Sequence, residues 1–205
     1  MTSLRPPKAV VFDLGNVLVR WDPRLPFVGS LTSDEVDAMF EEVDFAAFNH
    51  LQDAGRPWAV ALASIRERHP QHAAAMTLYR DNFAASLAGP VPGSERVVRD
   101  LRATGVRLLG LTNWSAETFP HAEPAAPVIG LLEDVLVSGE VGLAKPDPRI
   151  FRLLAERHGL DPEATVFVDD SAANVEAAAG EGFDALLFTD AERLRADLAE
   201  RGLPV

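Results

Sequence analysis

A chain of 205 residues is long enough for one well-packed domain, or for a core domain that carries a smaller inserted one. It has 19 basic and 31 acidic side chains, a net charge of −12, and because nucleic-acid backbones are held by clustered Lys and Arg, general nucleic-acid binding is not expected. The chain contains no cysteine, which excludes disulfides, thiol catalysis and thiolate metal sites.

The first predicted element is a strand near the N-terminus. The stretch Lys8–Val19 opens with continuous, largely β-branched apolar residues, which are typical of a parallel strand buried on both faces. Asp13 interrupts this apolar run, so the segment has the pattern of neither a signal peptide nor a membrane span. We therefore expect a cytoplasmic protein without a membrane partner.

The next part of the chain, from roughly residue 22 to residue 88, contains no strand-like run. Its apolar residues recur at spacings of three and four, which predicts amphipathic helices. These helices are expected over residues 33–43, 56–68 and 71–87. We predict a helical cap domain over residues 21–88, inserted into a core domain made of residues 1–20 and 89–205. The alternative is that these helices belong to one compact core.

After this insert, strand-like runs alternate with helical patterns up to the C-terminus. Strands are expected over residues 106–112, 134–138, 165–168 and 185–188. Helices are expected over residues 94–103, 148–158, 172–180 and 191–201. Such alternation indicates βαβ units with right-handed crossovers. The predicted fold class is α/β, with a doubly wound, Rossmann-like parallel sheet and an inserted helical cap.

Polar residues follow the predicted strands where the strands end. In open α/β sheets, ligands bind beyond the carboxyl ends of the strands, so these side chains should converge on one rim. The residues are Asp13, Thr112, Asn113, Asp169 and Asp170, with Lys145 in the loop that begins at Gly142. Three carboxylates, a hydroxyl and an ammonium are therefore expected in one site.

This set of groups suits phosphoryl transfer. Mg²⁺ prefers hard oxygen ligands and is typically held by one or two carboxylates together with the substrate phosphate. Asp13 and Asp170 are the natural metal-binding pair, and Asp169 either assists them or lies behind them. Lys145 adds positive charge and Thr112 can bond phosphoryl oxygens. Attack by Asp13 would give an aspartyl-phosphate, a known form of covalent catalysis.

Each of these residues also has an ordinary structural explanation. Asp13 could cap a turn, and either Asp169 or Asp170 could cap the following helix. Lys145 could be a surface charge, and Thr112 could be present only as a strand former. Large aromatic residues are mostly packing residues, so Trp21 and Trp114, which flank the predicted pocket, could either line the substrate site or fill the core. The five histidines show no metal-ligand spacing, His69 and His72 have no evident carboxylate partner, and we expect all five at the surface.

Four stretches of the chain resemble, in order, the motifs of the haloacid dehalogenase-like superfamily. Phe12–Val17 resembles the first motif and Leu111–Asn113 the second. Lys145–Pro148 resembles the third, and Phe167–Asp170, with Ser171 and Asn174 after it, the fourth. Each motif alone is a weak signal, but four in the family's order across almost the whole chain are a strong one. The helical insert lies where one type of cap occurs in that family.

The resemblance implies a role for each matching residue. Asp13 would be the nucleophile and a metal ligand, and the Gly15 carbonyl and Asp170 would be further ligands, with Asp169 assisting. Thr112 would bind the phosphoryl group, Asn113 would orient it, and Lys145 would hold both nucleophile and phosphate. The cofactor would be Mg²⁺. The substrate would be a small phosphorylated metabolite, for example a sugar phosphate, and the protein would be a monomer or a homodimer.

Gly15 departs from the family pattern. Most phosphatases of the family carry a second aspartate at this place, which acts as general acid and then as general base. Such help contributes ~10²–10⁴-fold to the rate, so its loss should matter most for poor leaving groups. A cap residue such as Asp22 or His50 could supply the proton instead. The Asp-Leu-Gly-Asn-Val form looks most like a subgroup that includes a sugar-1-phosphate phosphatase.

Three other functions are compatible with parts of this pattern. A dehalogenase of the same superfamily attacks carbon with its aspartate and needs no metal. It does not require a pair of acidic residues in the fourth motif, so the presence of Asp169 and Asp170 argues against this function. A receiver domain also holds an aspartyl-phosphate, but its acidic pair comes near the start of the chain rather than near the end. The third alternative is a binding or regulatory protein of this fold, which the missing acid at Gly15 would explain.

Overall fold

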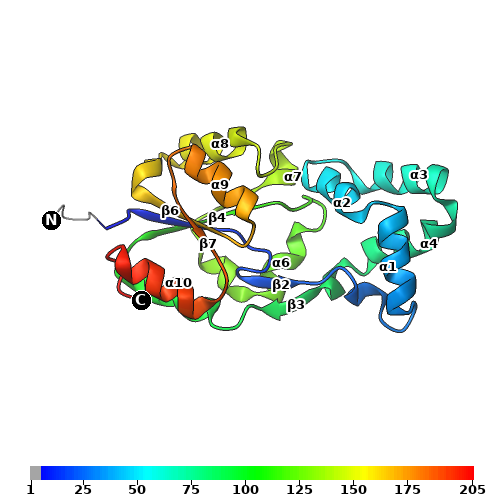
Figure 1. Cartoon of the computed structure of the whole chain (residues 1–205), viewed down its shortest axis with the longest axis horizontal. Coiled ribbons are helices and arrows are strands. Elements are labelled where there is room, and N and C mark those ends of the chain that lie inside the picture. Colours follow the sequence, from blue (N-terminus) through cyan, green and yellow to red (C-terminus); the bar gives the residue numbers. More distant parts are fainter. Residues whose placement is uncertain (1–5) are drawn as a thin grey trace.

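The computed structural model describes residues 6–205, and its centre is a parallel sheet of five strands in the order β5-β4-β1-β6-β7 (Figure 1). The strands are β1 (Ala9–Phe12), β4 (Arg107–Thr112), β5 (Val135–Val137), β6 (Thr165–Asp169) and β7 (Asp184–Leu187). Phe12 in β1 is in register with Gly110 in β4 and Val168 in β6. Each expected core strand is present within one residue or two, and the predicted doubly wound α/β fold is confirmed.

Helices cover both faces of this sheet, because the residues of its strands alternate between two hydrophobic clusters. Val10 and Phe12 point into the cluster that includes α5 and α10, whereas Val11 points into the cluster under α8 and α9. The helices of the core are α5 (Ser94–Thr104), α6 (Ala122–Ala125), α7 (Ser138–Val141), α8 (Pro148–His158), α9 (Ala172–Gly180) and α10 (Ala191–Glu200). Short 3-10 helices occupy Phe119–His121, Pro127–Leu131 and Pro162–Ala164.

The predicted helical segment contains four α-helices, which lie together at one end of the molecule (Figure 1). They are α1 (Ser33–Glu42), α2 (Phe45–Asp53), α3 (Trp58–Arg68) and α4 (Ala73–Asp81). Thr32 and Glu35 form a reciprocal capping box that begins α1, as their spacing favours. The ring of Tyr79 in α4 contacts the rings of Phe45 in α2 and Trp58 in α3, and also that of Phe27, which precedes α1.

One prediction for this segment was wrong, and one expected helix begins two residues later than predicted. The helix expected over 71–87 is a 3-10 turn at Pro70–His72, then α4, then a second 3-10 helix at Phe83–Ser86. It breaks because the backbone at Asn82 leaves the α-region and Leu87 is already extended. The helix expected from residue 56 begins at Trp58, because Pro57 is its extended N-cap residue. One further 3-10 helix lies at Leu25–Phe27.

A two-stranded antiparallel ladder joins the helical segment to the sheet and was not predicted. It pairs β2 (Val19–Trp21) with β3 (Leu87–Pro90), strands too short to show a clear period in the sequence. Both expected domain boundaries fall at this ladder. One hydrophobic cluster runs without interruption from the helical segment to the sheet. The division into a cap domain and a core domain therefore stays a prediction, and residues 1–5 of the expected core lie outside the described residues.

The expectation that the histidines lie at the surface is only partly met. His50 and His121 are exposed. His72 lies against α1, with its Nε2 at 2.7 Å from a carboxylate oxygen of Glu42, a partner that the sequence did not reveal. The His158 side chain is only 10% exposed, because it ends α8 close to the sheet edge. Within residues 6–205, no helix is both long enough and apolar enough to cross a membrane.

Candidate active site

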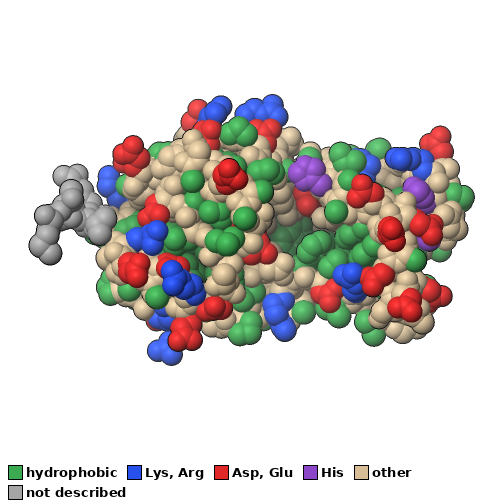
Figure 2. Space-filling model, viewed as in Figure 1, with side chains coloured by type: hydrophobic (Ala, Val, Ile, Leu, Met, Phe, Trp, Pro, Cys, Tyr) green, Lys and Arg blue, Asp and Glu red, His purple; other side chains and the backbone are tan. Residues whose placement is uncertain are grey.

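The carboxyl ends of β1, β4 and β6 open into a cavity of about 240 Å³ between the sheet and the helices α2 and α3. Figure 2 shows the molecule hollowed between these two parts. The cavity is lined by Asp13, Gly15, Asn16, Trp21, Asn49, Asp53, Trp58, Phe83, Thr112, Asn113, Trp114, Ser115, Thr118 and Asp170. Most of the residues proposed from the sequence therefore share one cavity, and both tryptophans that were expected to flank it line its wall.

Asp13 stands directly after β1. Its backbone amide donates to Val168 O of β6 at 2.8 Å, which fixes the strand end. Its carboxylate accepts the Leu14 amide at 2.7 Å and lies 3.0 Å from Lys145 Nζ. Burial raises the pKa of Asp13 to about 7; the charges of Asp169 and Asp170 add to this effect, and Lys145 opposes it.

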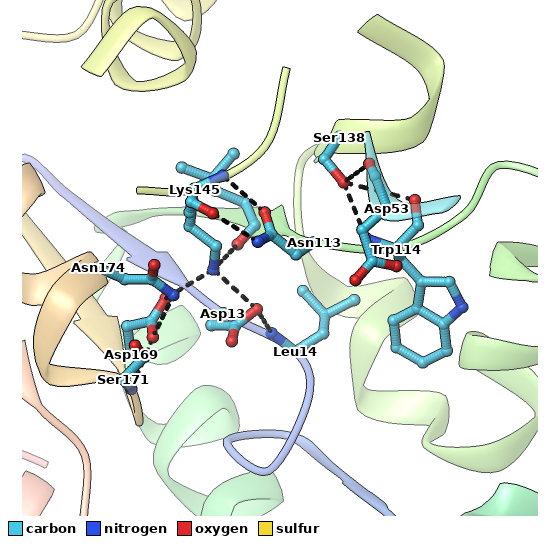
Figure 3. A network of polar contacts seen from close by, with 11 residues as sticks. Asp13, Leu14, Asp53, Asn113, Trp114, Ser138, Lys145, Asp169, Ser171 and Asn174 are labelled. Atoms are coloured by element: carbon cyan, nitrogen blue, oxygen red, sulfur yellow. Dashed lines mark hydrogen bonds and ion pairs between the residues drawn. The ribbon is translucent and has the colours of Figure 1, made fainter. Parts of the chain in front are cut away.

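Lys145 is buried completely, and its ammonium has three acceptors, one for each of its protons (Figure 3). Nζ donates to Leu111 O at 2.9 Å, lies 3.0 Å from an oxygen of Asp13, and bonds Asp169 at 2.6 Å. Burial alone would lower the pKa of Lys145, but the two carboxylates outweigh burial, so the pKa is raised and the side chain stays charged. Lys145 is thus not a surface charge.

Asp169 ends β6 and Asp170 follows it, and the two side chains have different surroundings. Asp169 is buried, and besides Lys145 it accepts bonds from Asn174 Nδ2 at 3.0 and 3.2 Å and from the Ser171 amide at 2.9 Å. Both of its oxygens are thus held by donors at the start of α9. Asp170 is exposed on the cavity side. Partial burial, followed by the charge of Asp169, raises the pKa of Asp170.

Thr112 is the last residue of β4, and Asn113 follows it. Thr112 is 1% exposed and lines the cavity. The Asn113 side chain donates to Lys145 O at 2.8 Å and accepts from Lys145 N at 2.8 Å, so it forms two hydrogen bonds with the backbone of Lys145. These contacts show Asn113 positioning Lys145. Its expected role in orienting a phosphoryl group stays a prediction.

The loop after Asp13 also lines the cavity, through Gly15 and Asn16. Asn16 has a left-handed backbone, φ 56°, which Asn tolerates better than most residues. A Cβ at Gly15 would meet no atom within 4 Å, so the position beside Asp13 has room for a side chain but holds none.

The groups expected to replace an acid at Gly15 are not in the cavity. Neither Asp22 nor His50 is among the described residues that line it; His50 faces the adjoining groove, and Asp22 accepts the Arg24 amide at 2.9 Å. Asp53, at the C-terminal end of α2, lines the cavity instead and was not identified from the sequence. Asn49 and Asp53 are four residues apart on one helix, which is a signal that could have placed them on a common face.

The cavity carries an excess of negative charge that suits a cation. One carboxylate oxygen from each of Asp13, Asp169 and Asp170 lies within 4.8 Å of the other two. Lys145 compensates only part of this charge, and the resulting repulsion contributes to the raised pKa of Asp13. Hard oxygen donors at such a spacing match the preference of Mg²⁺.

Comparisons with known proteins give matches that cover most of the chain. The sequence model of the haloacid dehalogenase-like hydrolases matches residues 7–182. A phosphoglycolate phosphatase of Cereibacter sphaeroides is 30% identical over 90% of this chain and 86% of its own. The sesquiterpene phosphatase astK of Aspergillus oryzae is 25% identical over 89% and 90% of the two chains. A HAD family enzyme from Bacteroides thetaiotaomicron, crystallised with magnesium and inorganic phosphate, has the same fold, with a TM-score of 0.71 and 22% identity over 90% of this chain and 95% of that one.

The position of Asp53 predicts a dependence of stability on pH. Burial, followed by the charge of Asp13, raises the pKa of Asp53 to about 7, against 3.8 for a free side chain. Between about pH 4 and pH 7 the folded protein therefore keeps a proton that the unfolded chain has released, so stability falls as the pH rises across this range and levels off above it. Asp53→Asn removes this loss, so it should raise the free energy of unfolding at pH 8 by on the order of 1–2 kcal/mol, and by less at pH 5.

Denaturant unfolding of the metal-free protein at several pH values between 5 and 8 measures this effect. Asp44→Asn is the matched control, because Asp44 is the exposed N-cap residue at the other end of α2 and Asn also serves as an N-cap. A difference between Asp53→Asn and wild type that is the same at every pH would contradict the prediction.

Proposed function

Because this chain belongs to the haloacid dehalogenase-like hydrolases, and its relatives support a hydrolase that acts on phosphate esters, we propose that it is a magnesium-dependent phosphatase of a small phosphorylated metabolite. Its reaction would pass through an aspartyl-phosphate at Asp13. The observation that carries the proposal is the convergence of Asp13, Thr112 and Asp170 on one cavity, with the Lys145 ammonium 3.0 Å from the Asp13 carboxylate.

In this proposal Asp13, Asp170 and the backbone carbonyl of Gly15 hold Mg²⁺. Asp169 supports them from behind, because its oxygens already accept bonds from Lys145, Asn174 and the Ser171 amide. When bound, the metal supplies positive charge against the substrate phosphate and the surrounding carboxylates. The negative charge of the cavity supports this assignment, as does the magnesium and phosphate bound to the enzyme from Bacteroides thetaiotaomicron.

The chain's own residues then perform the transfer. Asp13, held by the Leu14 amide and by Lys145, attacks phosphorus with its carboxylate. Lys145 stabilises the charge that develops on the phosphoryl oxygens, and Thr112 donates a hydrogen bond to one of them. Asn113 keeps Lys145 in place through its two bonds to the lysine backbone.

The cavity supports a small substrate. Its volume of about 240 Å³ lies below the usual range of drug-sized sites, roughly 300–1,000 Å³. Trp21, Trp58, Phe83 and Trp114 form an aromatic wall. Such a wall would cover the apolar face of a leaving group such as a sugar, in keeping with the subgroup suggested by Asp13–Val17.

Two other functions compete with this proposal: a dehalogenase and a binding protein of the same fold. A substrate panel assayed with and without magnesium separates the three. The expected result is hydrolysis of an aryl phosphate and of some member of a sugar- and acid-phosphate panel, with a fall on the order of 10²-fold or more when EDTA removes magnesium. Halide release from a 2-haloacid without metal would favour the dehalogenase. Absence of magnesium-dependent turnover across the panel would favour the binding protein.

Asp13→Asn should reduce turnover by at least ~10³-fold, because the amide cannot act as the nucleophile. The fold should persist, since Asn has the same shape, and thermal unfolding followed by circular dichroism checks it. Asp190→Asn, at the N-cap of the distant helix α10, is the control and should keep wild-type activity. Retained activity in Asp13→Asn would disprove the nucleophile assignment.

Gly15→Asp should preserve the rate on poor leaving groups or raise it by up to ~10-fold, because a second carboxyl group beside Asp13 can donate a proton. The open space around this position supports the expectation. The measurement is kcat/KM on an alkyl phosphate. A collapse of activity would show that the cavity is shaped around glycine.

A further inference from the structure

We propose that Asp53 is the general acid and general base of this site, which places the proton transfer on helix α2 rather than on the loop after β1. The proposal rests on the proposed phosphatase function. A leaving alkoxide must be protonated, and the hydrolytic water must lose a proton, whichever ester is cleaved. The position beside Asp13 provides neither function, since Gly15 has no side chain there.

The titratable side chains of the cavity leave few candidates for this work. Among the described residues that line it, these side chains are Asp13, Asp53 and Asp170. Asp13 attacks phosphorus, and Asp170 lies on the side assigned to the metal. Lys145 has an acceptor for each of its three ammonium protons, and its carboxylate partners keep it charged. Asp53 is therefore the titratable residue of this lining for which the proposed mechanism has no other role.

Contacts from both sides fix the position of Asp53. Asn49 Nδ2, one turn earlier in α2, donates to Asp53 Oδ2 at 3.0 Å. Ser138 Oγ, at the start of α7, donates to Asp53 O at 2.5 Å and accepts the Trp114 amide at 2.9 Å (Figure 3). The end of α2 is thus bonded to the loop after β4, in which Trp114 follows Thr112 and Asn113. The carboxyl group is held beside the reacting residues by this tether.

The surroundings of Asp53 suit an acid that also acts as a base. Trp58 and Trp114, both at most 5% exposed, line the same cavity as Asp53, which is itself partly buried. This burial, followed by the charge of Asp13, raises the pKa of Asp53 to about 7, so both protonation states are accessible near neutral pH. The hydrogen bond that Asp53 Oδ2 accepts from Asn49 can form whether the carboxyl group of Asp53 is protonated or ionised.

In the proposed reaction Asp53 gives up one proton and regains one within each catalytic cycle. As Asp13 forms its bond to phosphorus, the bond from phosphorus to the ester oxygen breaks, and that oxygen takes the proton of Asp53, which becomes a carboxylate. The Asp53 carboxylate then takes a proton from water as the water oxygen attacks the aspartyl-phosphate. The bond between phosphorus and Asp13 breaks, inorganic phosphate leaves, and Asp53 is protonated again.

Asp53→Asn tests the proposal with two esters in the presence of magnesium. On an alkyl phosphate, kcat/KM should fall by ~10²–10⁴-fold, because the alkoxide is not protonated. On p-nitrophenyl phosphate, whose leaving group needs no proton, one equivalent of nitrophenolate should appear in a burst, followed by slow turnover. Intact-mass spectra should then show one phosphoryl group on the protein.

His50→Gln is the matched control, because His50 is exposed on the same helix, faces only the adjoining groove, and should leave both rates unchanged. Wild-type alkyl-phosphate turnover in Asp53→Asn would overturn the proposal, as would equal losses on both esters without a burst. Loss in His50→Gln together with normal rates in Asp53→Asn would place the proton transfer on His50. Failure of the wild-type enzyme to hydrolyse any ester would overturn the phosphatase function itself, so the two failures are distinguishable.

Discussion

The buried ammonium of Lys145 is the interaction on which the site depends. It joins the ends of three strands, through Asp13 after β1, Leu111 O in β4 and Asp169 in β6. Two carboxylates buried at this depth without a cation would be strongly destabilising. The same three contacts connect strands β1, β4 and β6 at the carboxyl edge of the sheet, and they hold the Lys145 ammonium 3.0 Å from the Asp13 carboxylate. Fold and site are therefore built from one set of contacts.

Burial of the carboxyl groups, followed by their mutual repulsion, which Lys145 compensates only in part, explains the electrostatics of the site. Asp13, Asp169, Asp170 and Asp53 lie in or beside one cavity, and the pKa of Asp13 and that of Asp53 are both raised to about 7. Such a cavity repels a phosphate dianion unless a cation lowers its negative charge. In the proposed mechanism the metal provides that charge, and the overall net charge of −12 is no obstacle to an anionic substrate.

The helical segment contributes more than a cover to the cavity. Its aromatic side chains form one wall, and the end of α2 brings Asn49 and Asp53 to the same space. The bond from Ser138 to Asp53 O ties this helix to the sheet edge, so the segment and the sheet build the site jointly. In the proposed mechanism position 15 can be glycine, because Asp53 brings a carboxyl group into the cavity from α2.

The sequence by itself determined the part of this protein that lies along the sheet. Asp13, Thr112 and Asp170 could be predicted to meet because each lies at the end of a buried strand or directly after it, and the carboxyl ends of parallel strands share one edge. The role of Asp169 as a partner of Lys145, the β2–β3 ladder and the entry of Asp53 into the cavity were decided only by the tertiary structure. Asp53 and Ser138 are 85 residues apart, and the direction of α2 is set by aromatic packing and by this contact. Local periodicity shows which face of a helix is apolar, but it does not show which cavity its polar residues reach.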